Sequence, residues 1–144
     1  MLALVGKTEV DVEAALKDGR AMDMWIRMIE RQGGDPHATL PTAKETHTVT
    51  AEESGVVTTL DALSVGVASW RLGAGRARKE DPVQAGAGIE LHAKPGDTVT
   101  AGQPLMTLHT DEPQRFERAL ESLEGAWSIG QQAAPRTVIL DRVS

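Results

Sequence analysis

Apolar residues at helical spacing predict helices in the first third of the chain. The run from Met1 to Val5 has no N-cap before it and ends at Gly6, which is typical of the last turns of a helix. Thr8 is expected to cap a short helix that Gly19 ends. A second helix is predicted from Arg20 to about Gln32. Its apolar residues are Met24, Trp25, Ile26, Met28 and Ile29.

The apolar flank of this second helix is too wide for an isolated surface helix. Two interpretations remain open: the helix packs within this chain, or part of its surface belongs to a neighbouring segment outside it. Gly33 and Pro36 end the helix, because glycine accepts a left-handed C-cap and proline cannot continue the hydrogen-bond ladder. We therefore place a boundary here, between an N-terminal helical part and a main domain.

Alternating and β-branched residues dominate the next part of the chain. The segment 45–51 is predicted as a strand, and 56–60 as its hairpin partner after a turn. Asp61 is expected to cap a helix that runs to about Leu72. The predicted apolar face of this helix consists of Leu63, Val67 and Trp70.

Short strands and one more helix are predicted in the last third. The strands cover 89–92, the surroundings of Val99, and 105–109. Asp111 is expected to open a helix with Gln114 as its capping-box residue, and Gly125 ends it. The apolar stripe of this helix is Phe116, Leu120 and Leu123. Trp127 and Ile129 are expected either to start a strand or to act as a packing anchor, and a terminal strand is expected at 137–140. The order of elements predicts an α+β fold.

Composition narrows the function classes. A chain of 144 residues with 40% hydrophobic content can bury one ordinary core. The net charge of -6 argues against a nucleic-acid or anionic-membrane surface, and the absence of cysteine excludes disulfides and thiolate sites. Because no apolar run approaches the roughly 20 residues of a membrane span, we expect a cytoplasmic protein.

No catalytic constellation emerges from the residues themselves. The four histidines lack partners at ligand spacing, so no metal or cofactor is expected. The glycine-rich segment 72–76 follows its predicted helix, whereas a phosphate-cradling loop precedes one. The charged run 76–81 is either a solvated corner or a contact loop between domains, with Arg76, Arg78 and Lys79 as the candidate contact residues.

Four segments carry a resemblance to a known family. They read GGDP, ESGVVTTLDA, LGAGRARKED and GIELHAKPGDTVTAGQPL, in that order. This order resembles the C-terminal part of the thymidine phosphorylases, also called pyrimidine-nucleoside phosphorylases. The resemblance implies that residues 1–34 are closing helices of a large α/β domain, 35–41 a linker, and 42–144 a C-terminal α+β domain. That domain would be barrel-sandwich-like, similar to biotinyl and lipoyl domains, with flanking helices.

The resemblance also implies a parent reaction, in which phosphate attacks the anomeric carbon of a pyrimidine nucleoside and releases the base and a (deoxy)ribose 1-phosphate. The parent would be a pentosyltransferase and a homodimer. Its phosphate and base contacts would lie in helical and α/β segments upstream of Met1, so no catalytic or substrate-binding residue transfers to this sequence. The chain itself would complete a mobile lobe and be inactive alone. Family members commonly carry an acid where Gln84 stands, which leaves any contact made by that acid open here.

An alternative comes from another class of protein. The pattern KPGDTVTAGQPL is shared with biotinyl and lipoyl carrier domains, so a free-standing carrier or interaction module is the second hypothesis. Against it, no lysine stands at a tight hairpin flanked by methionine or an acid.

Overall fold

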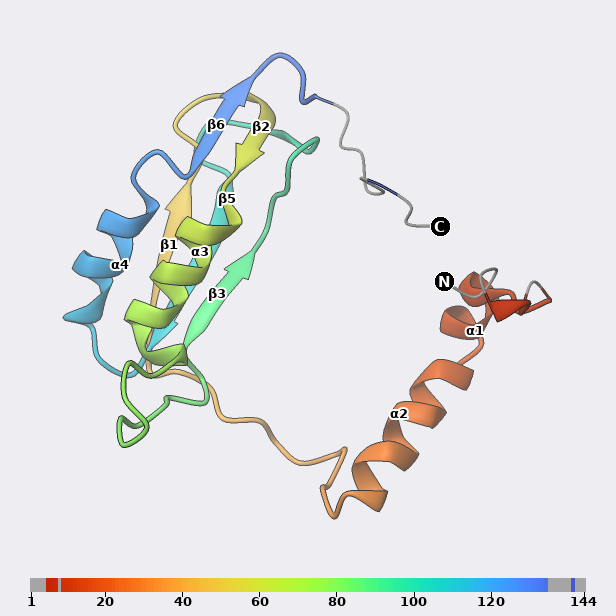
Figure 1. Cartoon of the computed structure of the whole chain (residues 1–144). Helices are drawn as coiled ribbons and strands as arrows, with labels where there is room; N and C mark the ends of the chain where they lie inside the picture. Colours follow the sequence, from red (N-terminus) through yellow and green to blue (C-terminus); the bar gives the residue numbers. More distant parts are fainter. Residues whose placement is uncertain (1–4, 8, 135–140, 142–144) are drawn as a thin grey trace. The chain divides into compact units, whose positions relative to one another are not determined.

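The computed structural model describes residues 5–7, 9–134 and 141 (Figure 1). The expected helix end at Met1 to Val5 falls largely outside these residues, and so do the Thr8 cap and the strand at 137–140. The chain divides into two compact units, residues 1–40 and 41–144, and each unit is described by itself. No helix in the described residues is long and apolar enough to cross a membrane.

The first unit consists of two helices, α1 (Val12–Lys17) and α2 (Arg20–Arg31). Asp11 is the cap of α1, because its Oδ1 accepts a hydrogen bond from the Ala14 amide at 2.9 Å. Gly19 separates the helices with a φ of 89°. The prediction of α2 is confirmed almost to its ends. Neither helix contains a buried residue, so the described part of this unit has no core of its own.

The second unit contains two antiparallel sheets of three strands each. One has the order β1-β5-β3 and the other β4-β2-β6. The α+β prediction is therefore confirmed, and the described strands form two sheets rather than a closed barrel. The strands are β1 (Glu45–Thr50), β2 (Gly55–Leu60), β3 (Gly88–Leu91), β4 (Thr98–Val99), β5 (Pro104–Thr110) and β6 (Trp127–Gly130).

The predicted hairpin between β1 and β2 is wrong. β1 pairs with β5, with Glu45 opposite Thr110, whereas β2 pairs with β4 and β6 in the other sheet. The reason lies in β5, which buries residues on both sides and is covered by a strand along each edge. The turn after β1 thus carries the chain from one sheet to the other instead of reversing it within one sheet.

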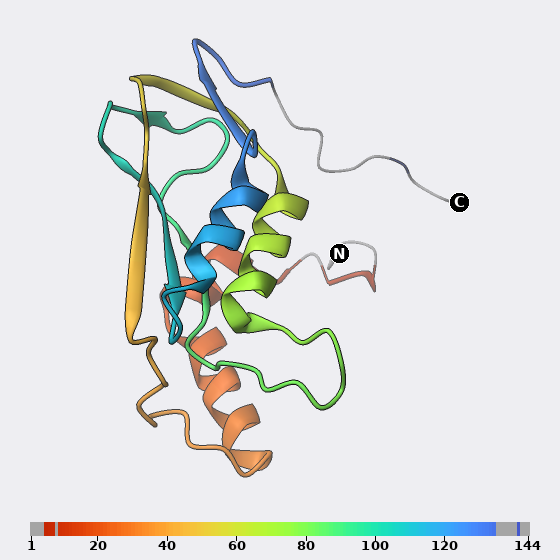
Figure 2. The same ribbon diagram turned by 90° about the vertical axis from the view of Figure 1, so that its left-hand side faces the viewer.

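Helices α3 (Ala62–Ser69) and α4 (Arg115–Leu123) lie side by side over one face of the β1-β5-β3 sheet (Figures 1 and 2). A π-helical turn, η2 (Trp70–Ala74), continues α3. The core between helices and sheet comprises Ala68, Leu72, Met106, Leu108, Ala119, Leu123 and Ala126. A smaller cluster of Ala51, Val57, Ala93, Val99 and Leu105 lies toward the second sheet, and Trp127 packs on both clusters.

The cap of α3 is confirmed, but its predicted apolar face is wrong. Asp61 accepts a hydrogen bond from the Ser64 amide at 2.8 Å. Leu63 is 75% exposed and Trp70 42% exposed, whereas Ala68 and Leu72 are fully buried. The helix packs through small residues because these allow α4 to approach closely, and its largest side chains are left outside.

Candidate functional site

The charged run forms an exposed loop between η2 and β3. Its backbone is organised by one carboxylate, since Asp81 Oδ2 accepts hydrogen bonds from the amides of Ala77 at 3.1 Å and Arg78 at 2.8 Å. Arg76 donates to the carbonyl of Lys79 at 3.0 Å. The candidate contact residues Arg76, Arg78 and Lys79 are all exposed on this loop. The loop therefore presents three cations on a backbone held by its own aspartate.

Gln84 ties the two ends of this loop together. Its backbone N–H donates to the carbonyl of Gly73 at 2.9 Å, and its side-chain Oε1 accepts from the backbone N–H of Asp111 at 2.8 Å. Its Nε2 donates to Glu112 Oε1 at 2.6 Å. Gly73 is required here, because it has a φ of 112° and a Cβ on it would lie 2.9 Å from Gln84 Cδ. Sequence reasoning missed this role, since the side-chain partners of Gln84 lie 26 to 28 residues further along the chain.

The same network explains why α4 begins later than predicted. The fully buried Thr110 hydroxyl donates to the Leu72 carbonyl at 2.7 Å and accepts from the Glu112 amide at 3.2 Å. Asp111, the predicted cap, accepts instead from the Lys44 amide at 3.1 Å. These contacts hold residues 110–112 in a corner, so that α4 starts at Arg115, without a side-chain cap from Gln114.

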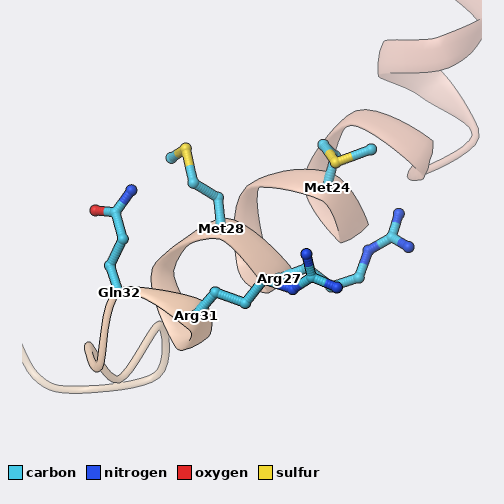
Figure 3. A pocket seen from close by; sticks show the side chains of 5 residues that line it. All are labelled: Met24, Arg27, Met28, Arg31 and Gln32. Carbon is cyan, nitrogen blue, oxygen red and sulfur yellow. The ribbon is translucent and has the colours of Figure 1, made fainter.

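An apolar face of α2 is open within the first unit. Met24, Met28 and Gln32 project along one side of the helix, beside Arg27 and Arg31 (Figure 3). These five residues line a shallow hollow of about 400 Å³. Met24 is 61% exposed and Met28 46% exposed. The two helices of the unit thus leave apolar surface that their own packing does not cover.

The titratable groups that the structure describes form no catalytic arrangement. His92 Nε2 lies 2.7 Å from Thr107 Oγ1, and His109 lies 3.8 Å from Glu90, so the two histidines have separate partners on the β3 and β5 strands. Among the described residues, no group of three or more histidines and carboxylates is placed to hold a metal ion. The hydrogen bonds that Asp61 accepts from Ser64 lower the pKa of its carboxyl, which fits a helix cap.

Comparisons with known proteins identify the family. The family model described as the pyrimidine nucleoside phosphorylase C-terminal domain matches residues 56–130. Thymidine phosphorylase of Mycobacterium tuberculosis H37Rv is 45% identical over 144 residues, which is 99% of this chain and 34% of that protein. Pyrimidine-nucleoside phosphorylases of Staphylococcus haemolyticus and Bacillus subtilis are 37% and 34% identical, over 87% and 88% of this chain and 30% of each relative.

The matched region contains both sheets' central strands, α3, the loop and α4. The chain therefore belongs to the pyrimidine nucleoside phosphorylase C-terminal domain family. It spans about a third of the length of the curated relatives that it matches. The resemblance inferred from the four sequence segments is confirmed.

Proposed function

We propose that this chain acts as the C-terminal part of a pyrimidine-nucleoside phosphorylase, which transfers the pentosyl group of thymidine or a related nucleoside to phosphate. The observation that carries the proposal is the 45% identity to a thymidine phosphorylase over 99% of this chain and only 34% of that protein. Phosphate and base would then be held by segments upstream of Met1, and the chain alone would not catalyse the reaction. The parent would be a cytoplasmic homodimer.

The first unit supports this assignment. A unit of about 40 residues rarely folds without disulfides, metals or a partner, and α1 and α2 contain no buried residue. The exposed face with Met24, Trp25 and Met28 requires an apolar partner to become a core. We assign residues 1–34 to the closing helices of a larger α/β domain, which supplies that partner, and 35–41 to a linker.

The second unit would be the lobe that closes over the substrate. Its two sheets would belong to a barrel-sandwich-like domain of the biotinyl and lipoyl type. In the closed form, Arg76, Arg78 and Lys79 would contact acidic groups of the helical domain. The support is that these side chains are exposed while the loop backbone beneath them is held at both ends, so closure requires little further ordering of the loop.

A chimera tests the assignment directly. The last third of the Mycobacterium tuberculosis thymidine phosphorylase is replaced by this chain, and base release from thymidine and from uridine with phosphate is followed by the change in ultraviolet absorbance. We expect phosphorolysis in the chimera and none with this chain alone. A folded, dimeric chimera without activity, or turnover by the chain alone at a rate similar to the relative, contradicts the proposal.

The contact loop is tested in the same chimera. Changing Arg76, Arg78 and Lys79 together to alanine should lower kcat/KM at least tenfold, because lobe closure loses three cations facing anionic groups. The matched control changes Lys17, Lys44 and Lys94 to alanine, which removes the same charge at exposed positions outside the loop and outside the open face of α2. Equal losses in the two triple variants would mean that net charge, and not the loop, sets the rate.

A further inference from the structure

A hollow of about 470 Å³ lies against η2, the loop after it and the start of α4. This volume is within the range of pockets that bind small molecules. Its wall includes Trp70 and Arg71 from η2, and Arg115 and Arg118 from α4. The proposed lobe contacts of Arg76, Arg78 and Lys79 are not part of this wall.

Trp70 supplies an aromatic surface in the wall. It is 42% exposed. Gly75 makes its position possible, because a Cβ on residue 75 would lie 2.9 Å from Trp70 Cδ1. An exposed indole beside a hollow offers a face on which a flat ring can stack.

The carboxylates in the wall are already occupied by donors. Asp81 accepts from two amides of its own loop. Glu112 accepts from the side chains of Gln84 and Gln114 and pairs with Arg115 at 2.9 Å. These contacts hold the loop and the helix start, and both carboxylates stay charged; the three arginines of the wall outnumber them.

The arginines, in contrast, have donors to spare. The Nε atoms of Arg71 and Arg115 are buried and have no acceptor in the described part of the chain. Arg71 otherwise donates to the Arg118 carbonyl and to Glu121, which anchors it between η2 and α4. The guanidinium of Arg118 has no hydrogen bond or ion pair with any described residue. These two buried atoms do not face solvent, so an oxyanion in the hollow would be held by the outer guanidinium nitrogens and above all by Arg118, through charge-assisted hydrogen bonds.

We propose that this hollow binds a small organic anion that carries a flat ring, with the ring on Trp70 and a phosphate or carboxylate group on Arg71, Arg115 and Arg118. Two-pronged contacts between guanidinium groups and oxyanions are the strongest that arginine makes. A ligand in this position contacts both the loop and α4, and so it holds the loop in place. The site is separate from the segments proposed to carry out phosphorolysis.

The test follows the indole N–H signals of the three tryptophans by nuclear magnetic resonance in this chain. The probes are uridine 5′-monophosphate, benzoate, uridine and inorganic phosphate, and the Trp70 signal is assigned with Trp70→Phe. We expect a saturable shift of the Trp70 signal with uridine 5′-monophosphate, benzoate or both, and at least tenfold weaker binding of uridine and phosphate. The first two probes distinguish a phosphate from a carboxylate ligand. No saturable shift with either, or equally tight binding of phosphate alone, overturns the proposal.

Two single variants locate the anion. Arg118→Ala should weaken binding of the better probe tenfold or more, since a hydrogen bond to a charged group is lost. Lys44→Ala removes one exposed positive charge outside the hollow and should leave the affinity unchanged. An unaltered Trp127 signal verifies that each variant is folded. Unchanged binding in Arg118→Ala, or equal weakening in both variants, refutes the site. The outcome is independent of the chimera, because no turnover is measured.

Discussion

Replacement of Thr110 by valine removes the central hydrogen bonds of the corner between β5 and α4. The side chain is fully buried, and its hydroxyl joins the Leu72 carbonyl at 2.7 Å and the Glu112 amide at 3.2 Å. Valine has nearly the same shape, so Thr110→Val opens no cavity. The variant leaves the Leu72 carbonyl without a partner, because carbonyls in the last turn of a helix such as η2 have none within the helix. It also leaves the backbone amide of the half-buried Glu112 without its acceptor.

The expected loss follows from these two orphaned groups. A buried polar group without a partner costs about 1–3 kcal/mol, and the half-buried amide regains part of its loss from water, so we expect about 2–3 kcal/mol in total. For a unit of about 100 residues, each kcal/mol lowers Tm by about 4–8 °C, which gives a decrease of roughly 8–24 °C. Urea and thermal unfolding followed by circular dichroism measure both quantities.

Thr48→Val is the matched control for this variant. Thr48 is exposed on β1, so the same chemical change should alter the free energy of unfolding by less than about 0.5 kcal/mol. Thr110→Ser provides a second comparison, because it keeps the hydroxyl and loses only a methyl group. The reasoning is refuted when Thr110→Val is no less stable than Thr48→Val, or when Thr110→Ser is the more damaging change.

Two further variants test the packing of the second unit. Gly86→Ala should destabilise it by about 1–3 kcal/mol in urea unfolding, because the added Cβ would lie 2.6 Å from the backbone nitrogen of Ala43. The carboxyl pKa of Asp61 is lowered by its bonds to Ser64, so its cap stabilises the fold above pH 3.8 and the stabilisation is lost as the pH falls through the folded pKa. Asp61→Asn should therefore unfold with a weaker pH dependence below pH 4, as measured by acid titration of the circular dichroism signal.

These two predictions have their own controls. Gly66→Ala places a Cβ on α3 where no atom lies within 4 Å, so it should be neutral or stabilising. A Gly86→Ala variant as stable as Gly66→Ala would show that the backbone near Ala43 moves away at no cost. Asp11→Asn changes a cap of the first unit, and the acid unfolding of the second unit should not respond to it. If Asp61→Asn unfolds below pH 4 with the same pH dependence as the unchanged chain, the Asp61 carboxyl does not contribute to acid unfolding.

Elements set by near neighbours could be predicted from the sequence. The extent of α2, the Asp61 cap and the strand β1 depend on residues a few positions apart, and their patterns were sufficient. Four ordered segments were also enough to predict the family, because several motifs at matching spacing rarely coincide. The candidate contact loop was found through its charges alone, and its function stays a proposal.

Only the tertiary structure decided which elements meet. The pairing of β1 with β5, the late start of α4 and the role of Gln84 all join residues that are far apart in the sequence. The physical reason is that strand pairing and buried hydrogen bonds depend on groups that are distant in the sequence and become buried together, so a local sequence pattern cannot predict them. The small-residue face of α3 was also decided by a distant element, because close packing against α4 outweighed the burial of Leu63 and Trp70. Trp70 was therefore left in the wall of the hollow that also contains three arginines.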